Sequence, residues 1–162
     1  MSYYEDLKRI TRHAKTYLGP LESREIVKDQ DKISILEAGS GTKILFLHGV
    51  AVSKSSWRTV MHNLCDKYHT IAVDVPGYNY SKDFPNMNYS LRSLSQWLES
   101  VVNSITTADE SLHLVGHSIA AGIAAYYSAS HPAKLKSLTL LNMPEMFCDP
   151  NVDLEKCKTD LS

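Results

Sequence analysis

Short runs of consecutive apolar residues alternate along this chain with longer segments in which apolar residues recur at helical spacing. Four runs lack the apolar and polar alternation of a half-exposed strand, a pattern typical of strands covered on both faces; they lie at 43–49, 69–75, 111–117 and 135–142. The intervening spacing predicts helices over 55–68, 91–105 and 118–131. Because buried strands alternate with helices, we predict an α/β fold with a mostly parallel sheet and helices on both faces.

The flanking segments have different patterns. Residues 23–28 and 32–37 alternate apolar and polar positions, which predicts two antiparallel strands and brings the total to about six. Residues 3–18 carry an apolar stripe at helical spacing that stops at Gly19-Pro20. We therefore divide the chain into an appended helix at 1–20, a core at 21–144, and a segment at 145–162 that is either a polar tail or the start of a further segment.

Composition narrows the class of protein. The 162 residues are 43% hydrophobic and 22% charged, enough to bury one core, so a single soluble domain is expected. A net charge of −1 without a basic stripe argues against nucleic acid as a partner. Three scattered cysteines form no metal-ligand spacing, and we expect neither a metal nor a cofactor. With no leader-like or membrane-spanning run, the expected location is the cytoplasm.

Unusual residues gather where the predicted strands end. His48-Gly49, Asp74 and Ser118 each follow or close a buried run. Parallel sheets place their ligands at the carboxyl ends of the strands, so these residues are expected to share one edge of the sheet. Ser118 has two interpretations at this point, because serine is also a favoured residue at the start of an ordinary helix.

Three motifs resemble those of the α/β-hydrolase family, in the family's order, from about residue 32 to 144. LFLHGVAVSKSSW is similar to its H-G-x-x-x-S-x-x-x-W loop, DVPGYNYS to its D-x-P-G-x-G-x-S loop, and LVGHSIAAG to its nucleophile elbow. Two positions depart from the family pattern. Ala120 replaces the second glycine of the elbow, and Asn79 replaces the second glycine of the middle loop.

The resemblance implies a role for each residue of these motifs. Ser118 would be the nucleophile of a serine hydrolase, on a sharp turn that Gly116 permits. The backbone N–H groups of Val50 and Ile119 would form the oxyanion hole. His48 and Gly49 would shape the first loop. From the residues themselves, His117 is expected to be a core or supporting residue and not the general base, because successive side chains near a strand end point apart. Asp74 is expected to order its own loop, with the triad acid as its alternative role. Serine at the elbow favours ester-type acyl transfer over the dehalogenase and epoxide-hydrolase chemistries, in which relatives use aspartate.

The remaining catalytic groups have no counterpart in the sequence. In the family, an acid and then a histidine follow the elbow, yet no histidine follows His131, and Glu145 is poorly aligned with the acid because Pro144 precedes it. The chain thus resembles the amino-terminal part of the fold, truncated after about six strands. Two functions stay open: a serine hydrolase of small esters or related acyl compounds that lacks its triad acid and histidine, or a non-catalytic binding or interaction protein. The strand at 135–142 would then be an exposed edge through which the chain self-associates.

Overall fold

The computed structural model describes residues 21–28, 31–78 and 89–144. The helix expected at 1–20 and the segment at 145–162 lie outside these residues, as does Asn79. Within the described ranges, no helix is long and apolar enough to cross a membrane, and no group of three or more His, Cys, Asp or Glu side chains is placed to hold a metal.

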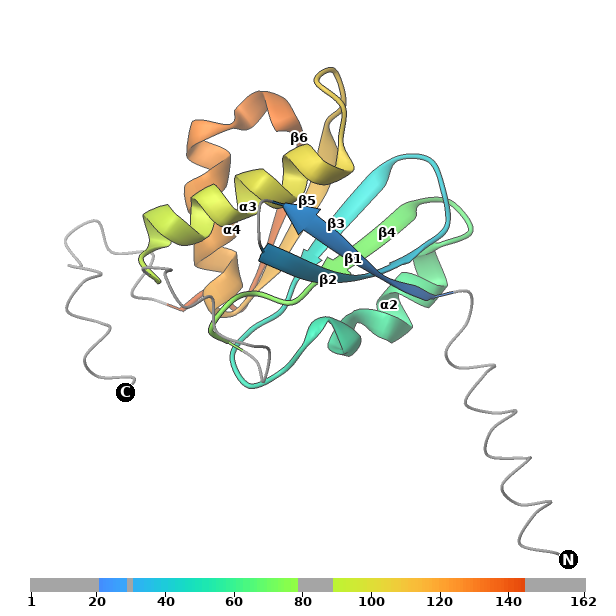
Figure 1. Ribbon diagram of the computed structural model, residues 1–162, viewed down its shortest axis with the longest axis horizontal. Helices are drawn as coiled ribbons and strands as arrows, with labels where there is room; N and C mark the ends of the chain where they lie inside the picture. Colours follow the sequence, from blue (N-terminus) through green and yellow to red (C-terminus); the bar gives the residue numbers. More distant parts are fainter. Residues whose placement is uncertain (1–20, 29–30, 79–88, 145–162) are drawn as a thin grey trace, which may run out of the picture.

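A six-stranded sheet forms the centre of the molecule, in the order β1-β2-β4-β3-β5-β6 (Figure 1). The four predicted buried runs pair in parallel, and the two alternating segments pair antiparallel at one side. The strands are β1 (Glu22–Lys28), β2 (Asp31–Ala38), β3 (Lys43–Leu47), β4 (His69–Val73), β5 (Leu112–His117) and β6 (Leu135–Leu141). The mostly parallel α/β sheet predicted from the sequence is confirmed.

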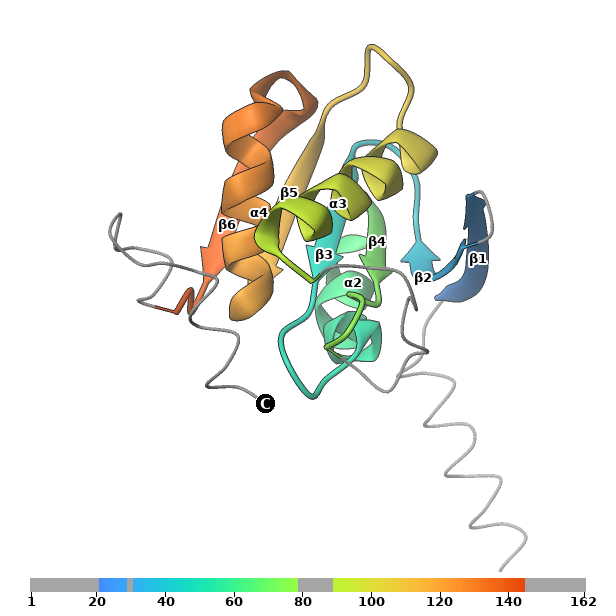
Figure 2. The same cartoon turned by 60° about the vertical axis from the view of Figure 1, so that its left-hand side comes forward.

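Helices cover both faces of this sheet (Figure 2). On one face lie α3 (Leu91–Ile105) and α4 (Ile119–Ser130), and on the other lies α2 (Arg58–Leu64), entered through the short 3-10 helix η1 (Lys54–Trp57). A second 3-10 turn, η2 (Pro132–Lys134), leads into β6. Successive residues of β3 point to opposite faces of the sheet. Leu45 packs with α3 and α4 on one face, whereas Phe46 packs with Trp57 and Met61 on the other.

Serine side chains determine where α3 begins and why the helix expected at 55–68 begins late. The Ser90 hydroxyl accepts the Ser93 N–H at 3.3 Å and caps α3, whose apolar stripe is buried as the spacing predicted. The helix expected at 55–68 is shorter. Its first residues form η1, because the Ser53 hydroxyl accepts the Ser55 N–H and the Ser53 carbonyl accepts the Ser56 N–H, which closes a tight turn before α2 begins.

Strand β6 lies at the edge of the sheet and is less buried than its apolar sequence predicted. Leu138 and Leu140 pack against the core, whereas Ser137, Thr139 and Leu141 are exposed on the opposite face. The prediction from the apolar run of a strand covered on both faces is therefore wrong for the described residues, whereas the exposed edge strand expected from truncation of the fold is confirmed. The reason is that α4 packs on one face of β6, whereas α2, on the other face of the sheet, packs over β2 and β4.

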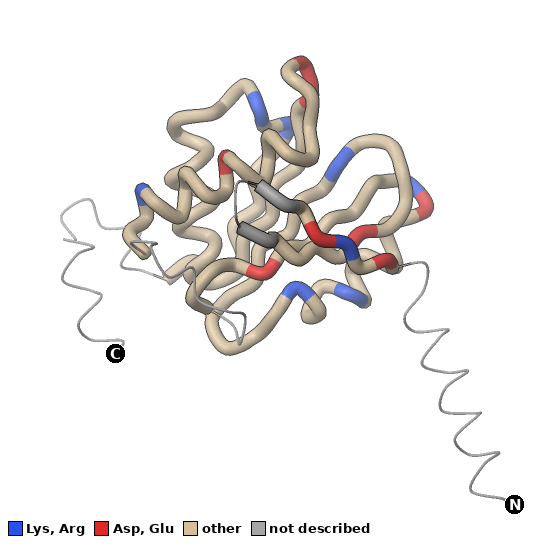
Figure 3. Tube along the Cα trace, in the orientation of Figure 1, with Lys and Arg blue, Asp and Glu red and all other residues tan. Residues whose placement is uncertain are grey.

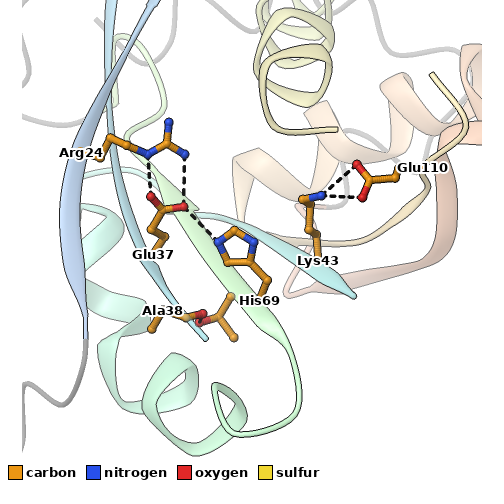
Figure 4. A network of polar contacts seen from close by, with 7 residues as sticks. Arg24, Glu37, Ala38, Lys43, His69 and Glu110 are labelled. Carbon is orange, nitrogen blue, oxygen red and sulfur yellow. Dashed lines mark hydrogen bonds and ion pairs between the residues drawn. The ribbon is translucent and has the colours of Figure 1, made fainter. Parts of the chain in front are cut away.

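Charged residues of both signs are interspersed along the described parts of the chain (Figure 3). Arg24 donates to Glu37 at 2.6 Å and 3.2 Å, and His69 Nε2 lies 3.0 Å from the same carboxylate (Figure 4). The Arg24 hydrogen bond holds the pKa of Glu37 below its ordinary value. This network joins β1, β2 and β4. Because His69 is the first residue of β4, the network lies away from the carboxyl ends of the parallel strands.

Candidate active site

Ser118 stands on a sharp turn between β5 and α4. Its φ of 57° and ψ of −128° lie in a region that residues other than glycine rarely occupy. The Ser118 N–H donates to the carbonyl of Leu141 at 2.8 Å, and the Ser118 carbonyl accepts the Ala121 N–H at 2.9 Å. The Ser118 side chain makes no capping hydrogen bond to α4. The ordinary helix-cap interpretation is therefore not supported, because the hydroxyl is not used to cap the helix.

Glycines allow the backbone to approach this turn closely. A Cβ atom built on Gly116 would lie 2.6 Å from the carbonyl oxygen of Ala120, so α4 can start where it does only because residue 116 has no side chain. A Cβ atom on Gly49 would lie 2.9 Å from Ser118 Cβ and 3.1 Å from His117 Nδ1. The loop that follows β3 thus passes directly against the serine.

These contacts bring together residues that are about 70 positions apart in the sequence. Gly116, His117, Ser118 and Ile119 form the turn after β5, and His48, Gly49 and Val50 form the start of the loop after β3. The two segments meet where Gly49 lies against Ser118. Val50 and Val52, in the same loop, expose 54% and 41% of their surface. The loop that contacts Ser118 through Gly49 therefore carries two exposed apolar side chains, Val50 and Val52, here called the apolar rim.

His48 is fully buried, and both of its ring nitrogens are engaged. Nδ1 lies 2.7 Å from the Gly49 carbonyl oxygen, which can only accept, so Nδ1 carries the proton. Nε2 then accepts the Val75 N–H at 2.9 Å. Burial is the main cause that lowers the pKa of His48 from its ordinary value, so the ring is held neutral. His48 therefore joins two loops and is not available to take a proton from Ser118.

His117 also lies apart from the nucleophile. Its ring stands edge-on to Trp57, with centroids 6.5 Å apart, which places it toward the face of the sheet covered by η1 and α2. In the described residues, no hydrogen bond joins the Ser118 hydroxyl to a histidine or a carboxylate. The sequence-based interpretation of His117 as a core or supporting residue stays a prediction, and its contact with Trp57 is the observation that bears on it.

Asp74 contacts the loop after β3, and its partner was not identified from the sequence. One carboxylate oxygen accepts the Lys54 backbone N–H at 2.9 Å, and the other pairs with the Lys54 ammonium. Asp74 Oδ1 also lies 3.6 Å from His48 Nε2. No sequence signal indicates this role of Lys54, because a lysine in a polar loop is ordinarily solvated.

Comparison with known proteins places these features in a family. The family model described as alpha/beta hydrolase fold matches residues 43–160. Monoacylglycerol lipase abhd6-A of Xenopus laevis is 32% identical over 103 residues, which are 64% of this chain and 31% of that protein. The probable lysophospholipase BODYGUARD 1 of Arabidopsis thaliana is 35% identical over 108 residues, which are 62% of this chain and 22% of that protein.

A solved structure gives the same result for the fold. A putative lipase (lip1) from Acinetobacter baumannii AYE superposes with a TM-score of 0.75 at 28% identity, covering 95% of this chain and 52% of that one. The chain thus spans about half of this solved relative and less than a third of the two curated ones. The matched region contains β3 to β6 and every residue of the site described above. The chain belongs to the α/β-hydrolase family.

Proposed function

We propose that this chain carries the nucleophile and the oxyanion-binding groups of a serine hydrolase that acts on small esters or related acyl compounds. The observation that supports this proposal most directly is the left-handed backbone of Ser118, on a turn that leaves its hydroxyl free of helix capping. Strained residues of this kind persist where the surrounding structure requires them, and they cluster at functional sites.

In the proposed reaction, the Ser118 hydroxyl oxygen attacks the ester carbonyl carbon and loses its proton to a base. The carbonyl oxygen gains negative charge, which the N–H groups of Val50 and Ile119 stabilise. Ile119 opens the 12-residue helix α4, where the first N–H groups have no partner within the helix and the helix dipole favours negative charge. Collapse of the intermediate expels the alcohol and leaves an acyl group on Ser118, which water then removes.

The general base is not among the described residues, because His48 is engaged at both nitrogens and His117 lies toward Trp57. We propose that the triad acid and histidine are absent from this chain and are supplied by residues outside it. A serine hydroxyl reacts slowly without such a base. The described half of the site therefore binds and orients the acyl group, and the completed protein performs rapid turnover.

The apolar rim supports the proposed substrate class. Val50 and Val52 are exposed on the loop that contacts Ser118 through Gly49, and the charge of Asp74 is paired with Lys54, so this loop favours a neutral acyl compound over a charged one. The names of the curated relatives, a monoacylglycerol lipase and a probable lysophospholipase, refer to acyl substrates. A reducing location in the cytoplasm accords with the free thiol of Cys65, buried beneath α2.

The first prediction tests the nucleophile with a fluorophosphonate probe, followed by mass spectrometry of the labelled peptide. We expect slow labelling confined to Ser118 and weak turnover of a p-nitrophenyl ester. Removal of a triad member leaves roughly 10³- to 10⁴-fold catalysis over water, which is the ceiling expected here. Ser118→Ala should abolish labelling, whereas Ser128→Ala, on the same helix with its hydroxyl bonded to the Ala125 carbonyl, should not change it. Labelling that survives Ser118→Ala would refute the assignment.

A second function is favoured because none of the described residues is placed to act as a base for Ser118. A non-catalytic member of the family would bind an acyl compound or a partner at the same rim without turnover. Calorimetry with a non-hydrolysable ester analogue distinguishes the two functions. Two results together would favour the binding protein. The first is saturable binding that Val50→Asp weakens, and the second is a lack of probe labelling at Ser118 even when the triad acid and histidine are supplied.

The second prediction concerns self-association through the edge of β6 that pairs with no other strand in the described part of the chain. This strand contains one charged residue, Lys136, whereas β1 at the other edge contains four, Glu22, Arg24, Glu25 and Lys28. Charged residues protect edge strands from pairing with another chain, so we propose that copies associate at β6. Sedimentation should show a concentration-dependent dimer that Thr139→Pro weakens and Ser23→Pro, at the other edge, does not. A monomer at all concentrations would contradict this.

A further inference from the structure

The loop after β3 has little side-chain burial to hold its shape. Val50 and Val52 are exposed, and Ala51 has a φ of 59°, a conformation that costs free energy for a residue with a Cβ atom. Such a loop would adopt many conformations if nothing else restrained it. The position of this loop against Ser118 must therefore depend on polar contacts.

The structure shows three such contacts, and all lead to the segment that follows β4. His48 Nε2 accepts the Val75 N–H at 2.9 Å, the Ala51 N–H donates to the Tyr78 carbonyl at 3.0 Å, and Lys54 binds Asp74. Because β3 and β4 are adjacent parallel strands, their carboxyl-terminal loops lie side by side. The loop is thus held near its start, its middle and its end by one neighbouring segment.

The contact at the end of the loop differs from the other two because it includes charge. Asp74 accepts the Lys54 backbone N–H with one oxygen and pairs with the Lys54 ammonium through the other. The two side chains expose only 15% and 13% of their surface, so solvent screens this pair less than it screens an ordinary surface ion pair. Both the path of the loop and the orientation of the carboxylate depend on Lys54.

Asp74 also has an electrostatic effect on the site. Its Oδ1 is 3.6 Å from His48 Nε2, and His48 precedes the glycine that lies against Ser118. An unpaired carboxylate at this position would oppose the negative charge that develops on the substrate oxygen during acyl transfer. The Lys54 ammonium pairs with the Asp74 carboxylate and so neutralises its charge beside the loop.

We propose that Lys54 is a positioning residue of the acyl-transfer site: by holding Asp74 through its backbone N–H and its ammonium, it fixes the loop that carries the Val50 N–H and neutralises the carboxylate beside His48. This inference rests on the function proposed above. Lys54 does not touch the reacting atoms and acts through the loop.

The experiment compares Lys54→Met with Lys54→Arg and with the matched control Lys43→Met in the 162-residue chain. Lys43 lies at the amino end of β3, away from the loop, and pairs with Glu110 at 2.8 Å (Figure 4). Its replacement therefore removes a lysine and an ion pair without affecting the loop. Amide hydrogen exchange reports the Ala51 and Val75 N–H groups, and NMR titration reports His48. Neither measurement depends on catalysis.

In Lys54→Met we expect exchange at Ala51 and Val75 to accelerate about tenfold or more, as expected when local opening becomes easier. The pKa of His48 should rise, because a positive charge is lost while the charge of Asp74 remains. Labelling of Ser118 should slow by about 10- to 100-fold, somewhat less than the loss of a whole oxyanion donor. Lys54→Arg should restore most of each property, and Lys43→Met should match the wild type.

Asp74→Asn provides a second variant for the case in which Lys54→Met does not fold. It retains an acceptor for the Lys54 N–H and removes the negative charge, so the pKa of His48 should fall instead of rising. Unchanged exchange at Ala51 and Val75 and an unchanged His48 titration in Lys54→Met would overturn the proposal. If the loop loosens while the wild-type chain never reacts at Ser118, the role of Lys54 in the loop is supported and the proposed hydrolase function is what fails.

Discussion

Replacement of Gly116 with alanine is expected to destabilise the protein, although the same change at an ordinary strand position would stabilise it. Gly116 has no positive φ, so alanine should gain roughly 0.5–1 kcal/mol from reduced freedom of the unfolded chain. The added Cβ would instead lie 2.6 Å from the Ala120 oxygen and 2.8 Å from the Ala121 Cα. Both atoms belong to the backbone of α4, which cannot move aside as a flexible side chain does.

The expected magnitude follows from the cost of overpacking. Alanine should lower the free energy of unfolding by about 1–3 kcal/mol, and valine by about 3 kcal/mol or more. For a chain of this size, a loss of about 3 kcal/mol lowers Tm by roughly 6–12 °C. Urea unfolding measures the free energy, and probe labelling of Ser118 in the folded fraction reports whether α4 still starts at Ile119.

Gly41→Ala is the matched control for this substitution. Gly41 has a φ of 95°, and an added Cβ would meet only the Lys67 carbonyl oxygen, at 3.8 Å. Its cost comes from backbone conformation alone, about 1–2 kcal/mol, with no effect on the turn that bears Ser118. A Gly116→Ala variant as stable as the wild type would show that α4 does not approach β5 as closely as the structure indicates.

The strands and the turn at Ser118 could be predicted from the sequence because their signals are local. An apolar run such as KILFL is long enough to be identified as a buried strand, and small residues on either side of Ser118 indicate a sharp turn before a helix. The error at 135–142 has a physical reason as well. An apolar run reports how readily a strand is buried, but the cover on its second face depends on which other segments pack there.

The restraints on the loop after β3 could not be predicted in the same way. Lys54 and Asp74 are 20 positions apart, and they meet only because β3 and β4 pair in parallel and release their loops side by side. His48 was expected to shape its loop, but the sequence carries no information on the tautomer of the ring. That information comes from the Gly49 carbonyl on one side of the ring and the Val75 N–H on the other.

Replacement of His48 with leucine is expected to have the second large effect on stability. Leucine leaves the buried Val75 N–H without an acceptor and the Gly49 carbonyl without its donor. A buried polar group left without a partner costs about 1–3 kcal/mol, so the two together should lower the free energy of unfolding by about 2–6 kcal/mol at pH 8. His48→Gln, whose amide oxygen can still accept the Val75 N–H, should lose less.

The pH dependence of this loss distinguishes a buried neutral histidine from a residue that only fills space. Burial lowers the pKa of His48 from its ordinary value of 6.5, while Asp74 opposes the shift and Lys54 reinforces it. Between the folded and unfolded pKa values, the unfolded chain binds the proton and the folded chain does not. The contribution of neutral His48 is therefore nearly complete above about pH 7 and decreases as the pH falls through 6.5, by up to about 1.4 kcal/mol per pH unit.

The difference in unfolding free energy between the wild type and His48→Leu isolates this contribution, because Glu37, His69 and the other titrating groups are common to both proteins. Measured by urea unfolding from pH 8 to pH 5, the difference should be constant down to about pH 7 and then shrink as the wild type loses stability, since protonation of Nε2 removes the acceptor for the Val75 N–H. A difference that stays constant to pH 5 would mean that His48 does not titrate with folding. The ring would then be a packing residue, and the loop beside Ser118 would not be sensitive to acid through it.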